Sequence, residues 1–172
     1  MKTARILSLF VAAVLMLTAA SALAQAPAPQ PATPPPPPPD YGQPITNDQA
    51  IKVMAGAVAE AKKNKWNVVI TILDSGGQIV MINRLDGAQW GSVDISREKA
   101  RSSVALRRPT KALQDLIAQG GANLRLLNIG YSVLEGGIPI VVGGKLIGGI
   151  GVSGVTSQQD AQIAQAGIDA LK

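Results

Sequence analysis

The basic segment from Asp94 to Lys111 carries six cationic side chains, and Lys99 is the one whose position could support chemistry. At about 100° per residue, Arg101 falls on the polar side of a helix here, as expected for a solvated face. Lys99 falls instead on the opposite, apolar stripe. A lysine there either extends past the edge of the core or points into a pocket as an anion partner or a base. The sequence alone leaves both interpretations open.

Tyr131 is the second candidate, because the chain contains neither histidine nor cysteine. Their absence removes the commonest general base and most of the usual metal ligands. A tyrosine phenolate is among the few remaining side chains that can ligate iron, although packing is the more ordinary role of a tyrosine. The sequence also contains no Ser/His/Asp set, no metal-ligand cluster and no complete P-loop. We therefore predict no metal site, and a binding protein rather than an enzyme.

The glycine-rich stretch Gly149–Gly154 matches the pattern G-x-G-x-x-G, follows a predicted strand and precedes a predicted helix. On its own this pattern would indicate a dinucleotide-binding fold. We reject that interpretation because the preceding strand forms half of an antiparallel hairpin, whereas the dinucleotide fold uses parallel strands. Gly149 and Gly151 remain as places where a helix, another backbone or a flat ligand can approach closely, with tight internal packing as the alternative.

Hydrophobic spacing and turn residues predict the elements that position these side chains. The predicted elements, in order, are a helix from Thr46 to about Asn64, a hairpin of Val68–Leu73 and Gln78–Arg84, helices over Ser92–Leu106 and Thr110–Ile117, a hairpin of Ile138–Val142 and Lys145–Val152, and a final helix from Thr156. Tight hairpins form antiparallel sheet. The sequence therefore predicts an α+β fold, with a central antiparallel β-sheet made of two hairpins and helices packed on it in profilin/PAS-like layering.

The first 24 residues have the three parts of a cleavable signal peptide. Lys2 and Arg5 supply the positive charge, and Ile6–Leu17 is an apolar run too short to span a bilayer. The sequence Ala22–Ala24 offers small residues to a signal peptidase. We predict cleavage after Ala24 and a periplasmic or secreted protein, with an uncleaved membrane anchor as the alternative.

Residues 25–44 are rich in proline and alanine, which predicts an extended, disordered linker rather than part of a core. Residues 45–172 then have the length of one domain. The formal charge of +5 includes Lys2 and Arg5, so the exported chain would carry 5 − 2 = +3. A charge of that size does not predict a nucleic-acid partner.

The domain resembles the GlcG/HbpS-like haem-binding family, which includes the C-terminal domain of PduO-type proteins. The resemblance covers nearly all of residues 45–172 and keeps the family's order of motifs. The motifs that carry it are Gly136–Gly154, Gln159-Asp160, Ala164–Gly167, Arg84–Ala88, Lys99–Arg101 and Arg108-Pro-Thr110.

The resemblance implies a domain that assembles into homo-oligomers and binds haem or a related tetrapyrrole, with some members reported to degrade haem. Exported members resemble haem sensors or scavengers. Two alternatives stay open: an enzyme acting on a small oxyacid or slowly on haem, with Lys99 as base or anion clamp, and an oligomeric structural or sensory module that docks a partner protein.

The resemblance also suggests which residues would hold haem. Lys99 with Arg84 or Arg107 could pair with the propionates, and the apolar strands around Gly149 and Gly151 would provide the slot. Because the chain has no histidine, the iron would have to be ligated by Tyr131, Lys99, Met81, a hydroxyl group or no side chain at all.

Overall fold

The computed structural model describes residues 36–172, so the predicted signal peptide and residues 25–35 of the predicted linker lie outside the described residues. The described elements, in chain order, are β1 (Asp40–Tyr41), α2 (Asn47–Lys63), β2 (Val69–Asp74), β3 (Ile79–Arg84), α3 (Ser92–Leu106), α4 (Thr110–Ala118), the 3-10 helix η2 (Gly121–Asn128), β4 (Gly137–Val142), β5 (Lys145–Ser153) and α5 (Ser157–Asp169). Every predicted helix and strand is present in the predicted order. The sequence did not predict β1 or η2.

Four strands form an antiparallel sheet in the order β4, β5, β2 and β3. The outer pairs are the two predicted hairpins, and β5 pairs with β2 between them. The β4–β5 turn places Gly143 and Gly144 at φ of 57° and 78°, which are the left-handed conformations that a two-residue hairpin turn requires. β1 extends the sheet by pairing in parallel with the first residues of β5.

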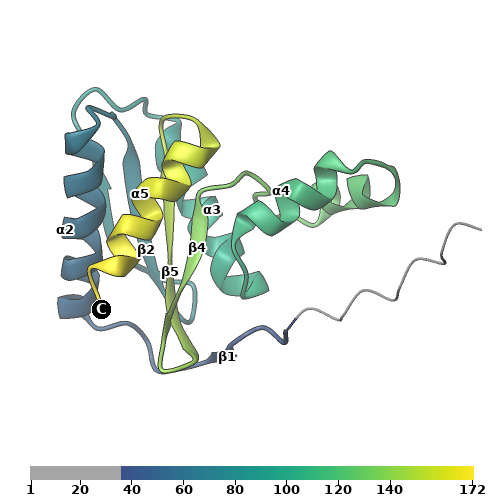
Figure 1. The fold of residues 1–172 in the computed structure, drawn as a ribbon, viewed down its shortest axis with the longest axis horizontal. Coiled ribbons are helices and arrows are strands. Elements are labelled where there is room, and N and C mark those ends of the chain that lie inside the picture. The colour runs from purple at the N-terminus through teal and green to yellow at the C-terminus, as the bar shows by residue number, and fades with distance from the viewer. Residues whose placement is uncertain (1–35) are drawn as a thin grey trace, which may run out of the picture. The chain divides into compact units, whose positions relative to one another are not determined.

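Helices cover both faces of this sheet and give the domain three layers (Figure 1). On one face lie α2 and α5, where Val53 and Ile163 pack with Ile150 in the larger apolar core. On the other face lies α3, where Ala100 packs with Leu73 in a smaller core. The predicted α+β fold is therefore confirmed.

Glycines allow α3 to lie close to the sheet. A methyl group on Gly151 would collide with the carbonyl oxygen of Ser96, and one on Gly149 would lie 2.6 Å from Ser103 Oγ. Thr71 on β2 completes the contact through a buried hydrogen bond of 2.8 Å with Ser96. The position of α3 over the sheet is thus fixed by backbone proximity as much as by apolar side chains.

The chain between α3 and β4 forms an arm that projects from the three layers (Figure 1). Its two ends are tied together at the base, where Gly137 N donates to Thr110 Oγ1 at 3.0 Å and Glu135 N donates to Gln114 Oε1 at 2.9 Å. At the tip, η2 has no buried residue. The large apolar side chains exposed at this tip are those of Leu124, Leu127 and Ile129.

The last residues of the predicted linker include a short strand of the sheet. Asp40 and Tyr41 form β1, and Lys145 Nζ donates to Asp40 Oδ2 at 2.8 Å. Gly42 N donates to Leu146 O at 2.7 Å. A two-residue strand next to a proline run has no hydrophobic period of its own, so it can be recognised only from its pairing with another strand.

Within residues 36–172 no helix is long and apolar enough to cross a membrane.

Candidate functional site

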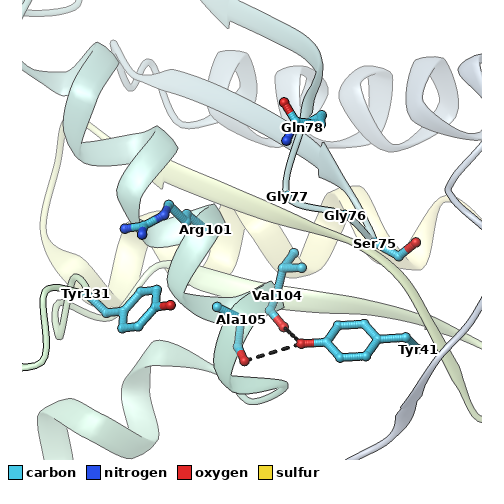
Figure 2. A pocket seen from close by; sticks show the side chains of 9 residues that line it. All are labelled: Tyr41, Ser75, Gly76, Gly77, Gln78, Arg101, Val104, Ala105 and Tyr131. Atoms are coloured by element: carbon cyan, nitrogen blue, oxygen red, sulfur yellow. Dashed lines mark hydrogen bonds between the residues drawn. The ribbon is translucent and has the colours of Figure 1, made fainter.

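Two adjoining pockets open beside α3, at the turn that connects β2 to β3. The first has a volume of about 360 Å³ and lies between Tyr41 and Tyr131 (Figure 2). The second has a volume of about 310 Å³ and is lined by Arg97. Gly77, Gln78 and Arg101 line both pockets, so the two lie side by side. We call them together the α3 groove; its principal side chains are those of Tyr41, Gln78, Arg97, Glu98, Arg101 and Tyr131.

Tyr41 forms one wall of the groove, because β1 holds it against the C-terminal end of α3. Its hydroxyl lies 3.0 Å from Val104 O and 3.3 Å from Ala105 O and donates to these carbonyls (Figure 2). The guanidinium carbon of Arg107 lies 5.4 Å from the centre of the Tyr41 ring. Arg107 adopts a left-handed conformation at the end of α3, with φ of 52°, which costs a residue other than glycine about 1 kcal/mol.

Tyr131 forms the opposite wall, on the segment that returns from the arm to β4. The guanidinium carbon of Arg101 lies 4.7 Å from the centre of the Tyr131 ring. Arg101 Nη1 also donates to Gly130 O at 3.3 Å and to Glu98 Oε2 at 3.1 Å. Arg101 therefore contacts Tyr131 through its ring and through the backbone of the preceding residue.

The third side of the groove is the β2–β3 turn, which one carboxylate shapes. Asp74 Oδ1 accepts hydrogen bonds from Gly76 N at 2.8 Å and from Gln78 N at 2.9 Å. An aspartate that bonds backbone amides a few residues later holds a turn in one conformation. The turn thereby presents Gln78 at a fixed position beside Arg101.

Lys99, the first candidate from the sequence, does not reach the groove. Its side chain is 2% exposed, and its Nζ donates to Asp160 Oδ2 at 2.7 Å and to Val152 O at 3.0 Å. It neither extends past the core nor opens into a pocket, because its anion partner is an aspartate of the same chain. Burial raises the pKa of the Asp160 carboxyl, and the pair with Lys99 offsets only part of that effect. Lys99 is thus occupied in joining α3 to β5 and α5.

The structure also places Gly149, Gly151, Arg84 and Met81 away from the groove. The two glycines lie under α3, so a helix of the same chain takes the space that the sequence left open for a flat ligand. Arg84 is exposed, and its Nε donates to Ala88 O at 3.1 Å in the connection before α3. Met81 packs against the core on the α2 side of the sheet.

The structure brings together Tyr131, which the sequence predicted, and two residues that it missed. Tyr41 was assigned to the linker, and Arg101 to a solvated face, where its side chain is 46% exposed. A signal was available in the composition, because the chain has only two tyrosines and both line this groove. Arg107 lies beside the groove through its contact with Tyr41. In the described part of the chain no group of three or more acidic, histidine or cysteine side chains could hold a metal ion.

A family match shows which proteins this chain is related to. Residues 45–169 match a family described as "Haem degrading protein HbpS-like". The chain belongs to the HbpS-like family. The resemblance inferred from the sequence motifs is therefore confirmed.

Two curated relatives show how this family's members differ in size. The chain is 38% identical to Protein GlcG of Escherichia coli K12 over 109 residues, which is 63% of this chain and 81% of that protein. It is 33% identical to the corrinoid adenosyltransferase PduO of Salmonella typhimurium over 118 residues, which is 67% of this chain but only 35% of that protein. Relative to PduO, this HbpS-like chain thus corresponds to one part of a longer protein.

Solved structures of relatives share the fold. A double mutant of Streptomyces reticuli HbpS is 30% identical, with a TM-score of 0.70 over 85% of this chain and 99% of that one. A crystal structure of a PduOC:Heme complex is 30% identical, with a TM-score of 0.68 over 74% of this chain and 94% of that one. The second of these shows that a similar domain was crystallised with haem.

Proposed function

We propose that this protein binds haem in the α3 groove. The observation that carries the proposal is that the groove joins both tyrosines of the chain to arginines, in a family in which a similar domain was crystallised with haem. Pockets of about 300–1,000 Å³ are the usual size for cofactors and other small ligands. The pocket between Tyr41 and Tyr131 has about 360 Å³ and adjoins a second one.

The residues of the groove suit ferric haem. Bound haem would supply an iron that accepts an oxygen ligand. Of the named ligand candidates, Lys99 is paired with Asp160 and Met81 packs against the core, whereas Tyr131 lines the pocket. The hydroxyl of Tyr41 donates to two carbonyls of α3. We therefore assign the ligand role to the phenol of Tyr131.

Two arginines are placed to pair with the propionates. Arg97 lines the second pocket. Arg107 lines neither pocket, but its guanidinium carbon lies 5.4 Å from the centre of the Tyr41 ring, which lines the first. A guanidinium binds a carboxylate with two parallel hydrogen bonds, so each arginine could take one propionate. Arg84 and Lys99, which the sequence also suggested for this role, are engaged elsewhere: Arg84 donates to Ala88 O, and Lys99 is buried against Asp160.

Titration of the purified protein with hemin tests the proposal. We expect a shifted Soret band that saturates, and about tenfold or greater weakening of binding in Tyr131→Phe, because the ring stays while the oxygen ligand is lost. Tyr41→Phe is the matched control, and it should keep the spectrum of the wild type. Absence of a Soret shift at micromolar hemin would contradict haem binding. An unchanged titration in Tyr131→Phe would contradict the assigned ligand.

Haem degradation is a second candidate function, favoured by the description of the family that the chain matches. The test is loss of the Soret band when hemin-loaded protein is incubated with ascorbate in air, with catalase present to remove free peroxide. Faster loss than with free hemin, abolished in Tyr131→Phe, would support it. Decay at the rate of free hemin would leave binding as the function.

Catalysis on an oxyacid by Lys99 has no support, because its Nζ is buried against Asp160.

Export to the periplasm or the medium is part of the proposal, with haem sensing or scavenging as the role. The support is the sequence of residues 1–24, with its charged start, apolar run and Ala22–Ala24. A mass measurement on protein recovered from the periplasm tests it. A mass that begins at Gln25 is expected, and full-length protein in the cytoplasmic fraction would contradict export.

Self-association completes the proposal and is supported by the arm. Residues 116–134 contain one charged side chain, that of Arg125, and the tip exposes Leu124 and Leu127. Exposed apolar patches of this kind mark protein–protein contacts. Light scattering should give the mass of a homo-oligomer, and Leu127→Glu should reduce it. A monomer at micromolar concentration would contradict this part of the proposal.

A further inference from the structure

We infer that Arg101 is the positioning residue for Tyr131: it orients the ring toward the groove and balances the negative charge that the phenolate carries when it binds iron. This inference rests on the proposed haem function. It concerns a residue that the sequence assigned to a solvated surface, and it explains how a tyrosine on a projecting segment is held in one place.

Arg101 contacts the Tyr131 segment at two points. Its guanidinium carbon lies 4.7 Å from the centre of the ring, within the range of a cation–π interaction. Its Nη1 donates to Gly130 O at 3.3 Å. The first contact fixes the plane of the ring, and the second fixes the backbone immediately before it. Figure 2 shows Arg101 and Tyr131 on the same side of the pocket.

The part of helix α3 that carries Arg101 is held firmly in place, as a positioning residue requires. Two residues earlier on α3, Lys99 is anchored to Asp160. The same helix lies directly against Gly151 of the sheet. Glu98 also accepts a hydrogen bond from Arg101 at 3.1 Å, which limits the rotation of the guanidinium. The Arg101 side chain, which contacts Tyr131, is therefore itself restricted in its motion.

The opposite wall provides a matched pair. There Arg107 lies 5.4 Å from the centre of the Tyr41 ring, and its Nη1 donates to Pro39 O at 3.4 Å. The hydroxyl of Tyr41, however, already donates to α3. Tyr41 is thus fixed without its arginine, whereas Tyr131 has no hydrogen bond from its hydroxyl among the contacts of the described residues and depends on Arg101.

Hemin and hemin dimethyl ester separate positioning from carboxylate binding, because the ester lacks free propionates. Arg101→Met should weaken binding of both by about tenfold and by the same factor, since the lost interaction is with Tyr131. Arg107→Met should weaken binding of hemin and leave that of the ester unchanged. Arg101→Lys, which keeps the charge, should restore part of the loss and part of the iron–phenolate absorption.

Hydrogen exchange of the haem-free protein tests the positioning role without haem. Amides of residues 129–135 should exchange faster in Arg101→Met and at the wild-type rate in Arg107→Met, while both variants keep the wild-type thermal midpoint to within a few degrees. Unchanged exchange in Arg101→Met would overturn the inference. So would a loss of affinity confined to hemin, which would make Arg101 a propionate partner. A wild-type protein that binds no hemin would refute the proposed function, and the exchange rates would still decide whether Arg101 holds the segment.

Discussion

Lys99 and Arg101 lie two residues apart on α3, and they occupy opposite environments. Lys99 is 2% exposed and paired with Asp160 where α3 meets β5 and α5. Arg101 is 46% exposed, lines the α3 groove and contacts Tyr131. One helix thus carries a buried cation that joins the layers and an exposed cation that lines the α3 groove. The difference teaches that a lysine on an apolar stripe is better interpreted as half of an internal ion pair than as a reactive group.

The largest effect should come from breaking the buried pair. Lys99→Met leaves Asp160 without its cation in the interior, and we expect a loss of about 3–5 kcal/mol in the free energy of unfolding. Urea denaturation followed by circular dichroism measures it. Arg101→Met is the control on the same helix, with an expected loss of less than about 1 kcal/mol. Equal losses in the two variants would remove the distinction between the buried and the exposed cation.

A smaller loss should follow from pushing α3 away from the sheet. In Gly151→Ala the new methyl collides with the backbone at Ser96, and overpacking of this kind costs about 1–3 kcal/mol. Gly91→Ala is the control, because no atom lies within 4 Å of the added methyl, and its loss should stay below about 1 kcal/mol. If thermal melts show both variants as stable as the wild type, α3 does not depend on the glycines of β5.

The pH dependence of stability tests how the buried pair is balanced. Burial raises the pKa of the Asp160 carboxyl on folding. The contribution of this group to the free energy of unfolding is therefore fully present below the pKa that the carboxyl has in the unfolded chain. It is lost as pH rises through the pKa of the folded state. The free energy of unfolding of the wild type minus that of Asp160→Asn should therefore decrease as pH rises, by at most about 1.4 kcal/mol per pH unit. Denaturation from pH 3 to pH 7 measures this difference. An increase with pH would show that Lys99 dominates over burial.

The smallest effect is expected at the wall of the groove. Tyr41→Phe removes a hydroxyl that donates to Val104 O and lies near Ala105 O. Loss of such a hydrogen bond lowers the free energy of unfolding by about 0.5–1.5 kcal/mol. Chemical denaturation should show this loss with no change in the circular dichroism of the native state. A loss as large as that of Lys99→Met would place Tyr41 in the core of the fold rather than at a ligand site.

Most of the fold could be predicted because its signals are local. The β-branched run before Asp74, the Gly143-Gly144 turn and the caps at Thr46 and Thr156 each lie within a few residues of what they determine. β1 escaped prediction because it pairs with β5, more than a hundred residues later in the chain. A two-residue strand has no period that a sequence pattern could reveal.

The candidate site was harder to predict, because its contacts join distant segments. Lys99 meets Asp160 61 residues later, and helical spacing cannot name a partner on another helix. Arg101 contacts Gly130, 29 residues later, on a segment without secondary structure. Tyr131 could be singled out from composition alone, since iron ligands are scarce in this chain. The residues that contact Tyr131 could not be predicted from the sequence.

Resonance Raman spectroscopy of the ferric haem complex tests the central claim most directly, because a phenolate bound to iron has its own vibrations. We predict these bands in the wild type and in Tyr41→Phe, and their loss in Tyr131→Phe. Deuteration of the tyrosine rings should shift the same bands. An identical spectrum for the wild type and Tyr131→Phe would show that haem, if bound, is held without Tyr131, and would contradict the assignment of the α3 groove as the haem site.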